Sequence, residues 1–333
     1  MVVRTQGPIE TRPLVPEERP IPMPGAREIL VRVFACGVCR TDLHVAEGDL
    51  PLRHPVVPGH QVVGRVEQRG SDATRFARGD RVGIAWLRWT DGTCAFCAGG
   101  RENLCPNAEF TGWSADGGYA EYATVHEDWA YRIPAAFDDV EAAPLLCAGI
   151  IGYRALRLTG VPPGGRLGVY GFGSSAHLML QIALARDVAV YVCTRGPDAQ
   201  AHARALGATW AGDVAADVPH ATDGTIIFAP AGELVPLALG NLAPGGTLVL
   251  AGIHMTPIPS MPYERLFQER VLRSVTANTR DDADALLREA AAIPLRPDVR
   301  AFPLADANEA LALLKRGAIR GTAVLVIDAR SGP

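Results

Sequence analysis

The sequence has 333 residues, of which 48% are apolar and 20% are charged. This length is sufficient for two domains with separate cores, and the composition is that of a globular protein. The formal net charge of -4 gives no basis for binding nucleic acid or an anionic membrane, so neither is expected as a partner.

The sequence contains no run of about 18 apolar residues, and its first residues, MVVRTQGPIETRPL, lack the apolar core and cleavage site of a signal peptide. We therefore expect a cytoplasmic location. Of the 7 cysteines, three lie close together at Cys94, Cys97 and Cys105. In a reducing compartment such a cluster indicates a metal site more often than disulfide bonds.

The N-terminal region is rich in Pro and Val, and the pattern EILVRVFACGV predicts a strand that leads into the motif CGVCRTDLH. A catalytic zinc needs about three protein ligands, from thiolates and neutral imidazoles, and keeps one open position. Cys39 is the best first candidate, His60 in the turn VPGHQVVG is the second, and Cys147 in APLLCAGI is the third. Asp42 would hold the ring of a ligand histidine through its other nitrogen.

Each of these ligands is a weak signal by itself. A cysteine in an apolar run, such as Cys147, is more often a buried core residue than a ligand. Cys36 is interpreted in that way, as a small buried side chain without a chemical role, and His54 is interpreted as a surface loop residue. The zinc prediction therefore depends on the combination of ligands.

In combination, Cys39-Arg-Thr-Asp-Leu-His44, Gly59-His60 and Cys147 resemble the zinc-dependent medium-chain alcohol dehydrogenases, over nearly the whole chain. The matching positions imply that Cys39, His60 and Cys147 hold the catalytic zinc. Zinc polarises an alcohol oxygen and lowers its pKa, and the alcohol then releases hydride to a nicotinamide. The resemblance thus implies reversible oxidation of a primary or secondary alcohol, aliphatic or aromatic, to an aldehyde or ketone.

The resemblance also implies roles for the neighbours of the ligands. Thr41 would contact the alcohol oxygen and pass its proton, by way of the nicotinamide ribose, towards His44. A hydroxyl both donates and accepts hydrogen bonds, which suits such a relay. Arg40 would meet the cofactor pyrophosphate. The sequence departs from the family after the ligand histidine, because Gln61 replaces the usual Glu and cannot carry its charge.

Residues 91 to 105, DGTCAFCAGGRENLC, form a second candidate metal site. Asp91, Cys94, Cys97 and Cys105 have the spacing of four ligands closed around a structural zinc that performs no chemistry. The family has a similar lobe, but its first ligand is normally cysteine. Zinc–oxygen bonds of about 2.0–2.2 Å and zinc–sulfur bonds of about 2.3 Å make the replacement by Asp91 tolerable. The alternative is a loop of reduced thiols.

Four aromatic residues flank this region, namely Trp86, Trp89, Phe110 and Trp113. The default interpretation of such residues is core packing. By resemblance, however, residues near Trp86 line the substrate pocket, which would favour medium-sized aliphatic or aromatic alcohols and aldehydes.

After Cys147 the sequence alternates between helical patterns and short Val-rich strands. A buried strand at 166–170 is followed by Gly171-Phe-Gly173-Ser-Ser-Ala176 and a helix over about Ser175 to Arg186. The first glycine permits the turn, the second lets a pyrophosphate approach helix N-terminal amides, and the third position needs only a small residue. With further strands at 225–228 and 247–251, this predicts a dinucleotide site in a Rossmann domain.

The residues after the next strand, Val188 to Val192, bear on the choice of cofactor. An NAD enzyme usually has an acid about 20 residues past the first glycine, for the ribose hydroxyls. Here the strand runs into Cys193-Thr194-Arg195 without an acid. Thr194 and Arg195 suit a 2′-phosphate, so NADP is favoured over NAD. The alternative is a solvated arginine on a loop.

The last part of the chain is expected to return to the first domain from about residue 278. A helix is predicted over Asp306 to Lys315, with Gly317 at its end and the strand AVLVI after Arg320. By resemblance Arg320 reaches the cofactor pyrophosphate, and a surface arginine is the alternative.

The predicted fold is α/β, with a mostly β, GroES-like, zinc-binding catalytic domain (1–148 and 278–333) and a Rossmann domain with a doubly wound parallel sheet (149–277). Two rival functions were weighed. A zinc-free medium-chain reductase of alkenes or quinones would not need the Cys and His ligands. A non-catalytic nucleotide-binding protein would not need the Thr41 and His44 relay. The resemblance implies a homodimer or homotetramer built through the cofactor domain.

Overall fold

The computed structural model describes residues 1–52 and 54–327, which divide into two compact units. The first unit comprises Met1–Cys147, Ala277–Ala291 and the chain from Arg296 onwards, and the second comprises Ala148–Thr276 and Ala292–Leu295. These boundaries lie one residue from those expected from the sequence, and the short segment 292–295 is added to the second unit.

The second unit is built on six parallel strands in the order β12-β11-β10-β13-β14-β15. Its strands are β10 (Arg166–Tyr170), β11 (Ala189–Cys193), β12 (Trp210–Gly212), β13 (Thr222–Ile227), β14 (Leu242–Leu250) and β15 (Val271–Ser274). Its helices are α4 (Ala148–Thr159), α5 (Ser174–Ala185), α6 (Pro197–Ala205) and α7 (Leu234–Gly240). Buried, apolar strands such as β11 (AVYVC) are typical of parallel sheets covered on both faces. The predicted doubly wound Rossmann sheet is confirmed.

Several boundaries differ from those predicted. Helix α5 starts at Ser174 and ends at Ala185, one residue earlier at each end than expected. Strand β11 runs one residue later, over Ala189–Cys193. Strand β14 begins at Leu242 rather than Thr247, before the Pro-Gly-Gly turn, because Leu242 already pairs with the start of β13. The register shifts between Thr222 and Gly224, so the turn residues form an irregularity within the strand and do not mark its start.

The first unit contains a sheet of seven strands in the order β16-β17-β3-β4-β5-β9, with β8 paired to β3. All pairs in it are antiparallel except β16 with β17. Its strands are β3 (Glu28–Gly37), β4 (Val62–Arg69), β5 (Arg81–Ile84), β8 (Tyr122–His126), β9 (Ala130–Arg132), β16 (Val299–Pro303) and β17 (Thr322–Val326). Two small ribbons pair β1 (Val2–Val3) with β2 (Leu14–Val15), and β6 (Leu87–Trp89) with β7 (Glu109–Phe110). The predicted mostly β domain is thus present.

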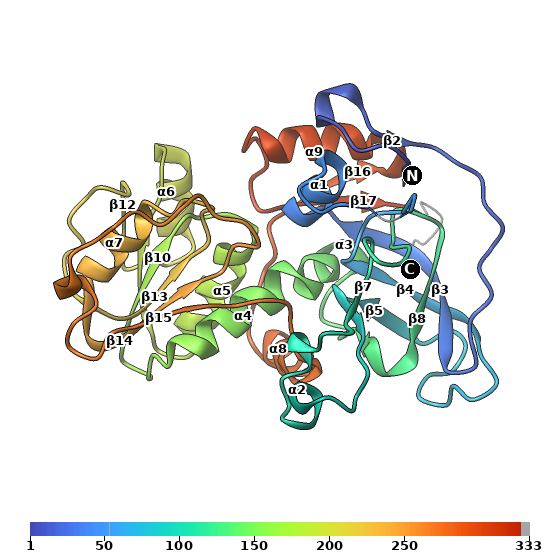
Figure 1. Cartoon of the computed structure of the whole chain (residues 1–333), viewed down its shortest axis with the longest axis horizontal. Helices are drawn as coiled ribbons and strands as arrows, with labels where there is room; N and C mark the ends of the chain where they lie inside the picture. The colour runs from blue at the N-terminus through green and yellow to red at the C-terminus, as the bar shows by residue number, and fades with distance from the viewer. Residues whose placement is uncertain (53, 328–333) are drawn as a thin grey trace. The chain divides into compact units, whose positions relative to one another are not determined.

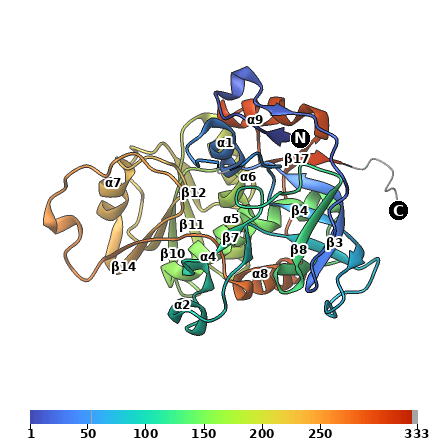
Figure 2. The same cartoon turned by 45° about the vertical axis from the view of Figure 1, so that its right-hand side comes forward.

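The helices of the first unit are α1 (Arg40–Glu47), α2 (Ala95–Ala98), α3 (Asp139–Ala142), α8 (Arg280–Ala292, of which the last residue falls in the second unit) and α9 (Ala307–Lys315). Helices α1 and α9 lie side by side (Figures 1 and 2). Lys315, the only lysine in the sequence, donates to Glu47 at the end of α1 and to Glu10, so it ties α9 to the helix that carries the first motif. None of the helices in the described ranges is long and apolar enough to cross a membrane.

Candidate metal centre and active site

The motif CGVCRTDLH covers the turn from β3 into α1. The helix begins at Arg40, and Cys39 is its N-terminal capping residue. The Asp42 carboxylate accepts a hydrogen bond from the Cys39 amide (2.8 Å), which satisfies a donor that the helix leaves unpaired. Because this bond holds the turn, the Cys39 side chain leaves the helix N-terminus in a fixed direction.

His60 lies in the loop before β4 and is 1% exposed. The preceding residue, Gly59, has a φ of 95°, and a Cβ there would lie 2.3 Å from the ring of Tyr119. Only glycine fits this position, because the conformation is left-handed and the space is filled. The Nδ1 of His60 lies 3.1 Å from Asp42 Oδ1, as the sequence predicted for a ligand histidine held by Asp42.

The structure brings Cys39, His60 and Cys147 together although they are far apart in the sequence. Their donor atoms all lie within 4.8 Å of one another, and the two sulfur atoms are 3.9 Å apart. His60 Nε2 is buried and has no hydrogen-bond partner among the described residues. A buried nitrogen without a partner is costly unless something binds it, and two thiols beside it complete a donor set suited to zinc. The predicted ligands therefore fit a zinc with one open position.

The protonation of these three side chains is linked. The hydrogen bond from Cys147 lowers the pKa of Cys39 well below its usual value, against the effect of burial. The same hydrogen bond, together with burial, raises the pKa of Cys147. Burial disfavours a charged His60, but the charge and hydrogen bond of Asp42 outweigh burial and raise the pKa of His60 to about 10. A metal that binds here must therefore displace protons.

The predicted relay residues both lie on α1. Thr41 is buried, and its Oγ1 lies 3.7 Å from the sulfur of Cys39. His44 lies one turn further along, and its Nδ1 is 2.7 Å from Asp49 Oδ2. Arg40 is exposed at the start of the helix. Asp49 was not identified from the sequence, because a carboxylate after a helix is an ordinary surface feature.

An aromatic cluster lies against the ligand histidine. The rings of Trp86 and His60 meet in a T-shaped arrangement, with their centroids 5.0 Å apart. Trp86 also stacks on Phe110 at 5.0 Å and on Trp113 at 6.2 Å. Gln61, which stands where the family usually has Glu, is 1% exposed, and its Oε1 has no hydrogen-bond partner among the described residues. One side of His60 therefore meets aromatic rings, whereas its Nδ1 faces the Asp42 carboxylate.

The second metal site gathers Asp91, Cys94, Cys97 and Cys105, whose donor atoms also lie within 4.8 Å of one another. The Asp91 carboxylate accepts bonds from the amides of Thr93 and Cys94 and from the Asn107 side chain, each at 2.9 Å. These bonds, the one from the Cys94 amide most of all, hold the pKa of Asp91 well below its usual range. The carboxylate is therefore charged and oriented in the position where the family has cysteine. Asn107 was missed in the sequence because a surface asparagine carries no metal signal.

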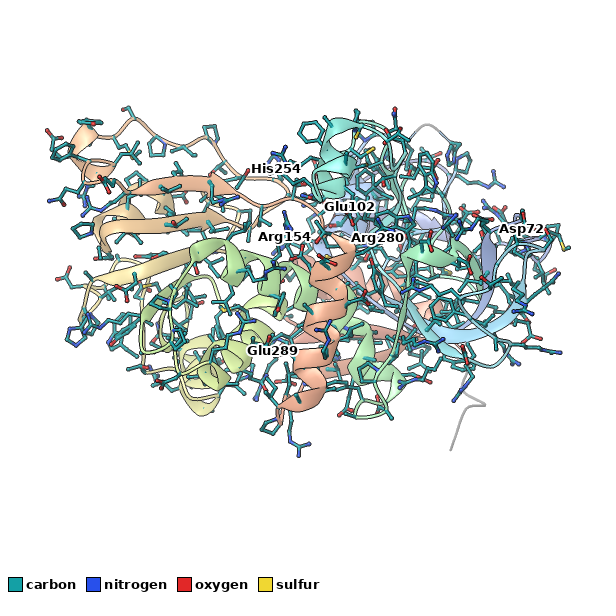
Figure 3. The ribbon with its side chains drawn as sticks, turned by 90° about the horizontal axis from the view of Figure 1, so that it is seen from below. Asp72, Glu102, Arg154, His254, Arg280 and Glu289 are labelled. Carbon is teal, nitrogen blue, oxygen red and sulfur yellow. The ribbon has the colours of Figure 1, made fainter. Side chains whose placement is uncertain are left out.

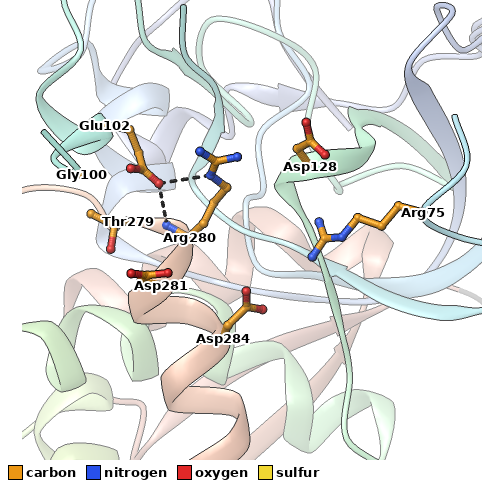
Figure 4. A pocket seen from close by; sticks show the side chains of 8 residues that line it. All are labelled: Arg75, Gly100, Glu102, Asp128, Thr279, Arg280, Asp281 and Asp284. Atoms are coloured by element: carbon orange, nitrogen blue, oxygen red, sulfur yellow. Dashed lines mark hydrogen bonds and ion pairs between the residues drawn. The ribbon is translucent and has the colours of Figure 1, made fainter. Parts of the chain in front are cut away.

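The loop of this second site contacts the start of α8 through Glu102. This carboxylate accepts hydrogen bonds from the backbone amide (3.0 Å) and the Nε (3.1 Å) of Arg280 (Figures 3 and 4). Arg280 in turn lies over the ring of Trp129, 4.8 Å from its centroid. A surface pocket of about 320 Å³ lies here, with Arg75 and Asp128 on its wall (Figure 4). The metal loop is thereby connected to the N-terminus of a long helix.

The glycine-rich loop of the second unit joins β10 to α5. Gly171 has a φ of 87°, and a Cβ there would lie 3.0 Å from the amide nitrogen of Ala229, so a side chain does not fit. Gly173 caps α5, and a Cβ at this residue would meet no atom within 4 Å. The space next to the helix N-terminus is therefore open, as approach of a phosphate requires. Ala176 is fully buried, which agrees with a position that accepts only a small residue.

The other predicted cofactor residues lie in different surroundings. Thr194 is buried just after β11, where its amide donates to Gly212 O (2.9 Å). Arg195, the next residue, is exposed. Arg320 pairs with Asp298 at 2.7 Å, and its side chain is 70% exposed. An exposed ion pair of this kind contributes little to stability, so breaking it would cost Arg320 little.

Comparison with known proteins identifies the family of the chain. Residues 25–135 match the alcohol dehydrogenase GroES-like domain. The chain is 53% identical over 332 residues to "Probable alcohol dehydrogenase AdhA" of Mycobacterium tuberculosis, with 98% of this chain and 96% of the relative covered. It is 35% identical to an alcohol dehydrogenase of Geobacillus stearothermophilus, with 95% and 97% covered. A solved cinnamyl alcohol dehydrogenase of Sorghum bicolor matches with a TM-score of 0.88 and 28% identity, covering 98% and 97%. The chain therefore belongs to the zinc-dependent medium-chain alcohol dehydrogenase family.

Proposed function

We propose that this enzyme transfers hydride reversibly between a primary or secondary alcohol and NADP+, at a zinc held by Cys39, His60 and Cys147. The observation that carries the proposal is the buried Nε2 of His60, which has no partner in the described part of the chain and lies within 4.8 Å of two thiols. Bound zinc would supply a Lewis acid that lowers the pKa of the alcohol hydroxyl.

The residues around the ligands then have separate roles. Asp42 accepts a hydrogen bond from Nδ1 of His60 and so directs Nε2 towards the two cysteines. Thr41, whose hydroxyl lies beside the Cys39 sulfur, accepts the alcohol proton and donates its own onwards. With a nicotinamide cofactor bound, His44 would receive that proton by way of the cofactor ribose. Asp49 accepts a hydrogen bond from Nδ1 of His44 and thus leaves Nε2 as the basic nitrogen.

The substrate is an alcohol with an apolar body. Trp86, stacked on Phe110 and Trp113, presents an aromatic surface beside His60. Aromatic surfaces of this size bind aliphatic and aromatic groups by burial of apolar area and by stacking. We therefore assign medium-sized aliphatic or aromatic alcohols and their aldehydes as the substrate class.

NADP is the preferred cofactor in this proposal, because Thr194 and Arg195 follow β11 where an NAD enzyme usually has an acid. Arg195→Asp should raise the KM for NADP about tenfold or more, since a charge-assisted hydrogen bond contributes about 1.5–3 kcal/mol. The same change should improve the use of NAD. The measurement is kcat/KM for both cofactors, with Arg166→Asp as a control, since that exposed arginine begins β10 and lies at the opposite end of the strand from the glycine-rich loop. An unaltered preference for NADP in Arg195→Asp would contradict the assignment.

A second, structural zinc completes the proposal, with Asp91 as ligand in place of cysteine. The carboxylate is charged, held by three hydrogen bonds, and within 4.8 Å of three sulfur atoms. Oxygen is a harder ligand than sulfur, so this site should bind zinc more weakly than four cysteines would. Its role is to stabilise the loop.

We also propose that the enzyme forms a homodimer or homotetramer through the second unit. Strand β15 is the last strand of the six-stranded sheet, and Val271 on it is 45% exposed. Nearby in the sequence, Tyr263 and Phe267 lie 5.7 Å apart and are 70% and 57% exposed. An unpaired strand edge beside exposed aromatic residues favours association with another chain. Molar mass from light scattering tests this, and a monomer would contradict it.

Two measurements together test the proposal as a whole. Elemental analysis of the desalted enzyme gives the zinc content per chain, and activity assays give the NADP- and NAD-dependent oxidation of alcohols. Two zincs and zinc-dependent oxidation of an aromatic alcohol are expected. If the enzyme holds only one zinc per chain, the Cys97→Ser variant shows which site is empty. A variant that retains the zinc and the activity would show that the second site had been empty. An enzyme that oxidises alcohols equally well without zinc would contradict the proposal.

A further inference from the structure

Tyr119 lies next to the metal centre although no motif singles it out. It is fully buried, in the segment 117–119, which pairs by backbone hydrogen bonds with the segment 57–59 that precedes His60. Its carbonyl accepts a hydrogen bond from the N-terminal ammonium of Met1 (2.7 Å). The backbone of Tyr119 is thus held on both sides, and the direction of its side chain is determined by that pairing.

The hydroxyl of Tyr119 donates to Asp42 Oδ2 at 3.1 Å. Asp42 is 1% exposed, and its two oxygens accept four hydrogen bonds. Oδ1 accepts from the Gly59 amide and His60 Nδ1, whereas Oδ2 accepts from the Cys39 amide and the Tyr119 hydroxyl. A buried carboxylate needs hydrogen bonds to replace those of the water that it has lost. Tyr119 supplies one of the four that do so.

The ring of Tyr119 has a different task from its hydroxyl. A Cβ on Gly59 would lie 2.3 Å from one ring carbon and 2.8 Å from the sulfur of Cys36. The ring therefore fills the space against which the backbone before His60 folds. Phenylalanine would keep this packing and remove only the hydrogen bond to Asp42.

We propose that Tyr119 is a positioning residue for the metal centre, whose hydroxyl holds Asp42 so that Asp42 keeps Nε2 of His60 directed at the two thiols. The inference rests on the proposed zinc function of Cys39, His60 and Cys147. Tyr119 acts through Asp42 and touches neither substrate nor metal. Partners of this kind commonly change metal affinity by about 10–100-fold when they are removed.

The test is Tyr119→Phe in the zinc-loaded enzyme, with zinc release to a coloured chelator as the readout. The catalytic zinc should leave about tenfold or more faster than from the wild type, while the zinc of the Asp91 site leaves at the wild-type rate. The matched control is Tyr131→Phe, because Tyr131 is equally buried in the same unit and lies beside Asn278 and Arg280 instead of Asp42. Cobalt substitution gives a second readout, since the visible bands of cobalt should shift in Tyr119→Phe and not in the control.

A double-mutant cycle with Asp42→Asn separates a role through Asp42 from packing. If the hydroxyl works through Asp42, adding Tyr119→Phe to Asp42→Asn should accelerate zinc release little further. Fully additive effects would overturn the proposal, as would equal zinc release from Tyr119→Phe and the wild type. The proposal would also be overturned if Tyr131→Phe released the catalytic zinc as fast as Tyr119→Phe does, because general destabilisation would then be the cause.

Failure of the proposed function has a different signature. If Cys39→Ser left the zinc content and the cobalt spectrum of the wild-type enzyme unchanged, the zinc assignment itself would be wrong. Unchanged zinc release in Tyr119→Phe, together with zinc loss in Cys39→Ser, would overturn the role of Tyr119 and leave the zinc assignment in place.

Discussion

The two metal sites of the first unit are built in different ways. Cys39, His60 and Cys147 come from three segments that are distant in the sequence. They provide three candidate ligands, and His60 is almost completely buried. The second site takes four ligands from the short stretch 91–105, most of them partly exposed. Three ligands leave a position for a substrate, whereas four close the coordination of zinc. In the proposed function, the distant ligands therefore serve chemistry and the local ones serve stability.

The carboxylates of the two sites are also used differently. Asp42 accepts four hydrogen bonds and supports a ligand, His60, without belonging to the group of donor atoms. Asp91 accepts three hydrogen bonds and is itself one of the donors. A carboxylate of the same kind is thus a support in one site and a candidate ligand in the other. Substitutions that affect one site and spare the other test this difference.

The largest effect is expected from His60→Ala. One zinc per chain should be lost and turnover should fall by about 10³-fold or more, because the Lewis acid contributes several kcal/mol and about 1.4 kcal/mol is a factor of ten. Elemental analysis and steady-state kinetics measure both. The zinc of the Asp91 site should remain. His54→Ala, a change of an exposed loop histidine, is the control, and equal results for the two variants would contradict the ligand assignment.

The zinc affinity of the first site should decrease as pH falls. Because the pKa of His60 is raised to about 10 without metal, His60 carries a proton from pH 9 down to pH 6, and zinc must displace it throughout. Each unit of decrease in pH should therefore weaken binding by about tenfold for this proton alone. Competition with a chelator in Cys97→Ser isolates the first site. An affinity that does not change between pH 6 and 9 would contradict the linkage.

An intermediate effect is expected from Thr41→Ala. Turnover should fall by roughly 10²-fold, the contribution of a positioned proton-transfer group, while both zincs are retained. Single-turnover kinetics and zinc analysis measure this. Thr41→Ser keeps the hydroxyl and should recover most of the rate. Wild-type turnover in Thr41→Ala would exclude Thr41 from the relay.

The smallest effect on catalysis is expected from Cys97→Ser. This variant should lose the structural zinc and unfold at a lower temperature, by about 2–4 °C for each kcal/mol of stability lost. Its turnover per folded enzyme should stay within about twofold of the wild type, because the site performs no chemistry. Asp91→Cys should have the opposite effect and retain zinc more tightly. A large loss of turnover in Cys97→Ser at a temperature where it is folded would contradict the division of roles.

Much of the fold could be predicted because its signals are local. The Gly171-Phe-Gly173 turn between a strand and a helix indicated the Rossmann sheet, which the structure confirms. Errors occurred at element ends, where pairing with a distant strand decides the boundary. Strand β14 starts at Leu242 because Thr222 of β13 pairs with it, and the turn residues between Leu242 and Thr247 had suggested a later start.

The sequence by itself indicated the four candidate ligands of the second site, the glycine-rich loop and, through resemblance, the three candidate ligands of the first site. These features depend on spacing along the chain or on motifs of a known family. The sequence indicated Asp42 as the support of a ligand histidine, whereas only the tertiary structure placed Tyr119 beside Asp42. Asp42 and Tyr119 are 77 residues apart and meet because backbone pairing brings segment 117–119 beside segment 57–59. Support of this kind acts through space and depends on burial, which a pattern along the chain does not record.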